Sequence, residues 1–237
     1  MALKLSPKKT FLLLCTLISV IIFAHFVSQS ILHFTGAQPG TTLYELLRRF
    51  NLDGEIAIGS WYSSVALLVS SFLLLITGFV KKEGSEKYYF HWFSLASIFL
   101  YLSIDEMIAI HELSVEPVRS VTGIESGLLY FAWVIPALII IGIVTLFFIK
   151  FFINLPKKTK ILFALSFAIF IGGSVIVEML SAQSYTSVSG NAIPGARLLS
   201  SVYLEEGMEM FGNALFIYAL LDHLSYVYKN KTLQIKF

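Results

Sequence analysis

Long apolar runs alternate with short polar connectors along this chain of 237 residues. The runs predict six helices, at about residues 11–33, 61–80, 89–110, 128–152, 161–180 and 202–221. A helix of about 20 residues rises about 30 Å, which is the thickness of the hydrocarbon core of a bilayer. Most of the runs lack the polar stripe of a water-facing helix, so we expect lipid around them. The pattern predicts an all-α fold in which residues 1–237 form one domain, a six-transmembrane-helix bundle.

The first outer connector, residues 34–59, contains a shorter helical pattern. Its apolar residues share one helical face: Leu43, Leu46, Leu47 and Phe50. Thr42 and Glu45 have the spacing of a capping box, which marks the start of a helix. We therefore expect a short amphipathic helix on the outer surface of the membrane, followed by a turn that contains Asp53. As an alternative to a simple turn residue, Asp53 could fold back over a site at the outer side. The longest stretch without a helical pattern, residues 181–200, is rich in Ser and Gly and predicts either a mobile lid or an irregular loop.

The charged residues divide between the two sides of the predicted bundle. All thirteen lysines lie before the first run, after the last run, or beside the connectors that follow the second and fourth runs. Basic residues near spans are retained on the cytoplasmic side, so we expect both termini to be cytoplasmic in a multi-pass protein of the cell membrane. Twelve of the fifteen acidic residues lie toward the opposite, outer side. This dispersed pattern of lysines predicts membrane lipids as partners and does not predict nucleic-acid binding.

Composition adds two restrictions. The single cysteine, Cys15, excludes an internal disulfide and a cysteine-based metal site. The first run, residues 11–33, is too long for the apolar part of a signal peptide and has no small-residue cleavage site. We therefore interpret it as a retained membrane span.

The most informative polar residues are acids at the outer ends of the third, fifth and sixth runs, because a charge inside an apolar run is costly and is generally functional. These acids are Asp105, Glu106 and Glu112 in or just after the third run, Glu178 in the fifth, and Glu205, Glu206 and Glu209 in the sixth. The third and fifth runs end on the outer side, and the sixth begins there. Span order therefore places the carboxylates at one depth, although it does not establish that the three helices touch.

Helical geometry adds two expectations about these runs. At about 100° per residue, one face of the third run carries a polar stripe, which we expect to face the bundle interior or water. The stripe consists of Ser94, Tyr101, Asp105 and Glu112. In the fifth run, Gly172 and Gly173 precede Glu178, and these small residues favour the close approach of a neighbouring helix.

Several carboxylates cannot all be ionised in a dry site unless a cation lies among them. We therefore predict a divalent metal ion with five carboxylate ligands, which are Asp105, Glu112, Glu178, Glu205 and Glu209. The predicted catalytic residues, acting as general base or proton carriers, are His111, Glu106 and Glu206. His111 is an alternative ligand. A donor set rich in oxygen and poor in histidine favours Fe, Mn, Ca or Mg over Zn, and the sequence contains neither a zinc-protease motif nor a Glu-x-x-His motif.

The leading hypothesis is a membrane-embedded, metal-dependent enzyme, either a hydrolase or an oxidoreductase. Its substrate would be a lipid or another membrane-borne molecule that enters between helices beneath residues 181–200. One alternative is a cation or proton transport protein, although the inner halves of the runs hold few ionisable groups. Another is a non-catalytic subunit of an oligomer or membrane complex. Two simpler interpretations are carboxylates solvated at the interface, and a structural network bonded to Tyr101, Asn213 and Ser174.

Overall fold

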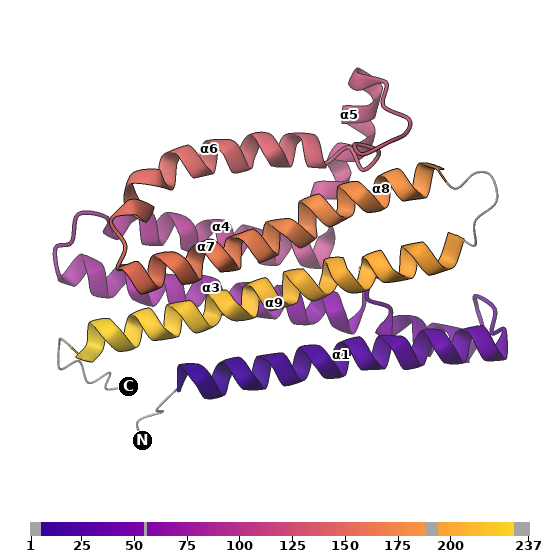
Figure 1. The fold of residues 1–237 in the computed structure, drawn as a ribbon, viewed down its shortest axis with the longest axis horizontal. Helices are drawn as coiled ribbons and strands as arrows, with labels where there is room; N and C mark the ends of the chain where they lie inside the picture. The colour runs from indigo at the N-terminus through magenta and orange to yellow at the C-terminus, as the bar shows by residue number, and fades with distance from the viewer. Residues whose placement is uncertain (1–5, 55, 188–193, 230–237) are drawn as a thin grey trace.

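The computed structural model describes residues 6–54, 56–187 and 194–229. In these residues every regular element is helical, and the long helices lie side by side in one elongated bundle (Figure 1). The long helices are α1 (Pro7–Thr35), α3 (Ile58–Glu83), α4 (Tyr89–Ile108), α6 (Val134–Ile153), α7 (Lys157–Ile171) and α9 (Pro194–Lys229). The shorter segments are α2 (Thr42–Leu47), η1 (Arg48–Phe50), η2 (His111–Ser114), α5 (Val115–Thr122), η3 (Gly172–Val177) and α8 (Glu178–Ser187). The all-α prediction is confirmed for this part of the chain.

Four helical segments are long and apolar enough to cross a bilayer: α1, α3, α6 and the continuous rod Lys157–Ser184, which joins α7, η3 and most of α8. A fifth candidate is α4 taken together with His111–Thr122, with a bend of 81° between them. Among the described residues α9 is not a candidate, and Asn213, Asp222 and His223 interrupt its apolar run. These helices support a multi-pass membrane protein, whereas the number of six spans stays a prediction.

The core of the bundle surrounds α9. One face of α9 carries buried apolar residues at every third or fourth position, which are Met210, Ala214, Ile217, Leu220 and Leu224, and Phe216 and Ala219 are buried on other sides of the helix. Helix α9 packs against α1, α3, α7 and η3, and it contacts α4 through the stacked rings of Phe99 and Phe216, whose centroids lie 4.6 Å apart. By contrast, α1 and α6 bury little of their surface within the chain, as expected for helices that face lipid.

Polar side chains set the relative depth of the central helices. Ser64 Oγ on α3 donates a hydrogen bond to the carbonyl oxygen of Ser103 on α4 at 2.7 Å. Ser70 Oγ, also on α3, donates to Oδ1 of Asn213 on α9 at 2.8 Å. All four residues are buried. Because interhelical hydrogen bonds of this kind contribute about 0.6 kcal/mol each in membrane bundles, they specify register more than they determine overall stability.

Helix α4 ends earlier than the sequence predicts. Ala109 adopts a left-handed conformation with φ 48°, and its N–H donates to the carbonyl oxygen of Asp105 at 2.7 Å, which caps the helix. The chain then bends into η2 and α5. The bend divides the predicted polar stripe, because Glu112 lies beyond it, and Tyr101 on α4 is 51% exposed and does not line the bundle interior. The residues of α4 that are buried in the bundle are Trp92, Ala96 and Ser103.

The loop predicted for residues 181–200 is wrong at both ends. Helix α8 continues to Ser187, because no glycine or proline stops it, and α9 begins at Pro194, a residue that fits the first turn of a helix. The centre of the predicted loop, residues 188–193, lies outside the described residues. The substrate entrance proposed beneath this segment therefore has helices on its two sides.

Helix α2 occupies the predicted position in the first connector, and its N-cap lies one residue before the expected cap, Thr42. Thr41 is the N-cap, and its hydroxyl oxygen accepts the N–H of Tyr44 at 3.4 Å. Leu43 and Leu46 are exposed, whereas Leu47 is buried against the bundle. Only one of these three leucines therefore packs against the bundle. The place of the helix on the outer surface of the membrane stays a prediction.

The two ends of the bundle differ in charge. Helix α1 begins and α9 ends at the same end (Figure 1). We call it the basic end, because Lys81 and Lys158 lie there, ion-paired with Glu86 and Asp222 respectively. At the opposite end, which we call the acidic end, α4 finishes and α8 packs beside α9 (Figure 1). Which side of the membrane each end faces stays a prediction.

Candidate functional site

Two glycines bring the α7–α8 rod into direct backbone contact with α9. A Cβ atom added to Gly173 would lie 2.7 Å from the carbonyl oxygen of Glu205 and 3.2 Å from Cγ of Glu209. A Cβ atom added to Gly212 would lie 2.7 Å from the backbone nitrogen of Phe170. No larger residue fits at either position without moving a helix. The predicted close approach at Gly173 is therefore present, and it involves α9.

The helical rod changes its hydrogen-bond pattern immediately before Glu178. Residues Gly172–Val177 form a π-helical turn, and Glu178 is the first residue of α8 after it. Such turns are rare and occur frequently at functional sites. Because a π-helical turn alters the number of residues per turn, it sets the side of the rod on which Glu178 lies.

Five glutamate side chains gather at the acidic end, and we call them the glutamate cluster. They come from α4, α8 and α9 and are Glu106, Glu178, Glu205, Glu206 and Glu209. Each is partly buried. The charges of the other four all act on Glu209, and Asp53, in the turn before α3, acts on three members of the cluster. Within the part of the chain that the structure describes, every charge acting on Glu206 and Glu209 is another carboxylate.

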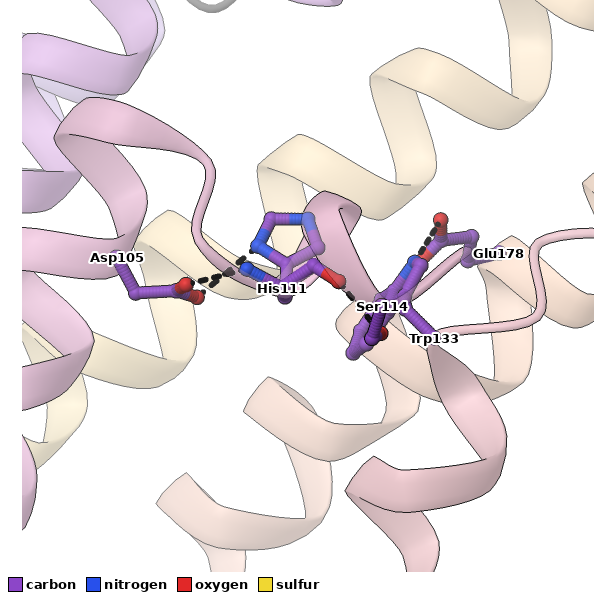
Figure 2. A network of polar contacts seen from close by, with 5 residues as sticks. All are labelled: Asp105, His111, Ser114, Trp133 and Glu178. Carbon is purple, nitrogen blue, oxygen red and sulfur yellow. Dashed lines mark hydrogen bonds and ion pairs between the residues drawn. The ribbon is translucent and has the colours of Figure 1, made fainter. Parts of the chain in front are cut away.

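His111 lies beside the cluster and is held by Asp105. The backbone N–H of His111 donates to Oδ1 of Asp105 at 2.8 Å, and its ring Nδ1 lies 3.0 Å from Oδ2 (Figure 2). Burial acts to lower the pKa of His111, but the hydrogen bond that its ring donates to Asp105 and the charges of Asp105, Glu178 and Glu112 outweigh burial and raise this pKa. The arrangement therefore favours an imidazole that carries a proton on Nδ1.

Trp133 connects His111 to the glutamate cluster. Its indole Nε1–H donates to Oε1 of Glu178 at 2.8 Å, and its ring meets the edge of the His111 ring at a centroid distance of 4.7 Å (Figure 2). Ser114 Oγ donates to the carbonyl oxygen of His111 at 2.7 Å, which stabilises the η2 turn. The segment from η2 to the start of α6 thus lies at the acidic end, where it holds the side chains of His111 and Trp133 beside the cluster.

Arg119, on α5, does not offset the negative charge of the glutamate cluster, because its guanidinium makes other contacts. Nη2 and Nε of Arg119 donate to the carbonyl oxygen of Tyr130 at 2.6 and 3.2 Å, and the guanidinium lies 4.2 Å from the centre of the Tyr130 ring. Nη1 lies 3.4 Å from a carboxylate oxygen of Glu116. Arg119 therefore anchors α5 to the loop that follows it.

The residues assigned to the site by sequence fall into two groups. The cluster contains three predicted metal ligands, Glu178, Glu205 and Glu209, and two predicted catalytic residues, Glu106 and Glu206. The other group, around the η2 turn, comprises Asp105, His111 and Glu112. Both carboxylate oxygens of Asp105 face His111, and Glu112 is exposed. In the described residues no three His, Cys, Asp or Glu side chains are arranged to hold a metal ion, so the ligand assignment stays a prediction.

Sequence analysis missed one contributor to the site and left another open. Trp133 fell inside a predicted span, residues 128–152, but α6 begins only at Val134. A tryptophan whose N–H needs a partner in an apolar environment is the signal that would have marked it. Asp53 was interpreted as a turn residue that could also fold back over the site, and its charge acts on the cluster in the structure.

Comparison with known proteins assigns the chain to a family. A family profile described as a domain of unknown function, DUF8692, matches residues 12–224. The chain belongs to the DUF8692 family. The matched region includes every residue of the glutamate cluster together with His111 and Trp133. No curated protein and no solved structure matches the chain. The function of this DUF8692 protein is therefore argued from the site itself.

Proposed function

We propose that the protein is a membrane-embedded, metal-dependent enzyme whose metal ion binds at the glutamate cluster. One observation carries the proposal: five carboxylates from three helices act on one another, and among the described residues His111 is the base whose charge acts on two of them, Glu106 and Glu178. Mutual repulsion of partly buried carboxylates is relieved either by protonation or by a cation. A divalent ion would offset two negative charges at once, and the carboxylate oxygens of the cluster would coordinate it.

The donor set favours a hard or borderline metal. Carboxylate oxygens suit Ca, Mg, Mn or a carboxylate-bound iron, whereas zinc sites generally use histidine and cysteine. We propose Glu178, Glu205 and Glu209 as ligands. Glu106 and Glu206 lie among them and can act as further ligands or carry protons. Without an ion, repulsion keeps such carboxylates apart, so coordination would require their side chains to change rotamer.

The neighbouring residues support acid–base chemistry. Asp105 binds the Nδ1 side of His111, which leaves Nε2 as the nitrogen that accepts a proton in the neutral ring. The metal would activate water or oxygen when bound, and His111 would take or return the proton. We propose a lipid or another membrane-borne substrate, because the cluster lies at the end of a helical bundle whose outer helices, α1 and α6, are apolar and little buried.

Elemental analysis of the purified protein tests this function. We compare the parent with the double variant Glu178→Gln, Glu209→Gln and with a control, Glu116→Gln, which changes an exposed glutamate on α5. The proposal expects near-stoichiometric metal in the parent and the control, and none in the double variant. Equal metal content in all three proteins, or no metal in the parent after purification without chelators and reloading with Fe, Mn, Ca and Mg, would refute it.

A second candidate function is proton or cation transport, and one observation favours it. Below the cluster on α9, Nδ2 of Asn213 is buried without a partner in the described residues, and His223 is buried farther toward the basic end. Ile217 and Leu220 are fully buried between them and interrupt a continuous polar path. Flux of protons or metal ions into sealed vesicles, abolished by Asn213→Leu, would favour transport over the enzyme.

A further inference from the structure

A second feature of the acidic end is a pocket that does not include any member of the glutamate cluster. It has a volume of about 380 Å³ and lies between η1, the start of α3 and the end of α4. Ligand pockets commonly enclose about 300–1,000 Å³. Its lining residues are Arg49, Ile56, Ala57, Ile58, Ser60, Trp61 and Met107. Arg49 is the one charged residue in this lining, so the pocket combines a single cation with apolar walls.

The guanidinium of Arg49 has unused hydrogen-bond donors. Its Nη1 makes one long hydrogen bond, 3.4 Å, to the carbonyl oxygen of Ile56. No carboxylate forms an ion pair with it in residues 6–54, 56–187 and 194–229. The preceding residue, Arg48, differs in this respect, because its Nε lies 2.6 Å from Oε2 of Glu45. Arg49 thus presents most of its planar donor set to a ligand.

The walls of the pocket continue onto the side of the bundle. Trp61 is 61% exposed, Met107 is 49% exposed and Ile56 is 74% exposed. Over much of their surface these side chains are not covered by the described part of the chain. A tryptophan at the end of a membrane helix is typical of the interface between lipid headgroups and acyl chains. An acyl chain that lies against Trp61 and Met107 would place its headgroup near Arg49.

We propose that this pocket binds an anionic membrane lipid, with Arg49 holding the headgroup phosphate and with Trp61 and Met107 contacting the acyl chain. Arginine donates paired hydrogen bonds to phosphate oxygens, and the interaction is strengthened by charge. The positive charge also selects an anionic headgroup over a zwitterionic one, whose own cation competes with the guanidinium. The site is independent of metal at the glutamate cluster.

Lipid binding to the full-length protein in detergent tests the assignment. Phosphatidylglycerol, phosphatidylcholine and inorganic phosphate are titrated separately, and binding is read by native mass spectrometry and by the shift in thermal unfolding. The parent should bind phosphatidylglycerol saturably and at least tenfold more tightly than phosphatidylcholine. Inorganic phosphate at the same concentrations should not compete, because it lacks the acyl chain.

Two adjacent arginines supply a matched control. Arg49→Gln should weaken phosphatidylglycerol binding at least tenfold, and Arg49→Lys should recover part of the loss. Arg48→Gln removes the same charge one residue away and should leave binding within twofold of the parent. Trp61→Ala tests the acyl wall and should also weaken binding. Equal affinity of the parent and Arg49→Gln, equal losses in the two glutamine variants, or competition by free phosphate would overturn the proposal.

Discussion

Asp105 contacts His111 through both oxygens of its carboxylate, 2.8 Å from the backbone nitrogen and 3.0 Å from ring Nδ1. The first bond fixes the backbone of the η2 turn, and the second fixes the orientation and tautomer of the ring. A single side chain thus links the end of α4 to the catalytic residue that we propose.

Replacing Asp105 should lower the pKa of His111. Asp105→Asn removes the hydrogen bond and the charge that raise this pKa and leaves the burial that lowers it. The pKa can be followed by NMR of histidine ring carbons in the chelator-treated protein. His33→Gln identifies another histidine signal and serves as an assignment control. An unchanged pKa in Asp105→Asn would show that the pair does not form in solution.

The same variant should alter the pH dependence of stability. Because folding raises the pKa of His111, the pair contributes stability fully below the unfolded pKa of about 6.5, and this contribution is lost as the pH rises through the folded pKa. Asp105→Asn should therefore lower the thermal unfolding temperature more at about pH 5.5 than at about pH 9. The opposite order would mean that the carboxylate stabilises the backbone of η2 and not the charged ring.

Alanine at the two contact glycines should destabilise the bundle. Gly173→Ala and Gly212→Ala each place a Cβ atom 2.7 Å from a backbone atom of the facing helix, and the forced separation should cost about 1–3 kcal/mol. Thermal unfolding in detergent measures the effect. The control is Gly142→Ala on α6, where nothing lies within 4 Å of the added atom. Similar unfolding temperatures for all three variants would contradict the close contact.

The hydrogen bond between Ser70 and Asn213 should show coupling in a double-mutant cycle. Ser70→Ala leaves Oδ1 of Asn213 buried without its donor, so it should lower stability by about 1 kcal/mol. Asn213→Leu in the Ser70→Ala background should recover stability, because both polar groups are then gone. Ser97→Ala, which removes only an exposed bond within α4, should have little effect. Additive losses in the double variant would argue against the bond.

The predicted orientation can be tested by cysteine labelling. In a Cys15→Ser background, Ser126→Cys lies in the loop after α5 and Ser85→Cys lies in the turn between α3 and α4. With six spans and cytoplasmic termini, an impermeant maleimide added to intact cells should label residue 126 and should label residue 85 only after permeabilisation. Labelling of both positions in intact cells would rule out this arrangement.

The sequence predicted the long helices well because the thickness of a bilayer imposes their length. Helix α3, for example, extends the predicted run of residues 61–80 by only three residues at each end. Span order also predicted that Glu178 and Glu209 lie at one depth, and the two carboxylates act on each other in the structure. Contact between their helices depends on Gly173 and Gly212, of which only Gly173 was connected to packing in advance.

The faces and bends of the helices were not predictable from periodicity alone. On α4 the buried side depends on where α3 and α9 pack, so Ser103 faces the bundle and Tyr101 does not. The bend that brings His111 to Asp105 depends on a left-handed Ala109, a conformation that alanine rarely adopts and that composition does not signal. Polarity identified the correct region, whereas tertiary contacts determined which acids meet.

The π-helical turn Gly172–Val177 makes the angular phase of α8 depend on a single residue. Deleting one residue there would restore ordinary helical bonding and rotate everything beyond it by about 100° relative to α7. Glu178 would then leave the side of the rod that faces α9 and Trp133, although the rod would keep its length and apolar character. Chain length in this short segment is therefore as decisive for the site as the identity of the acids. Deleting one residue here, a change that a hydropathy profile would not detect, is therefore sufficient to disrupt the site.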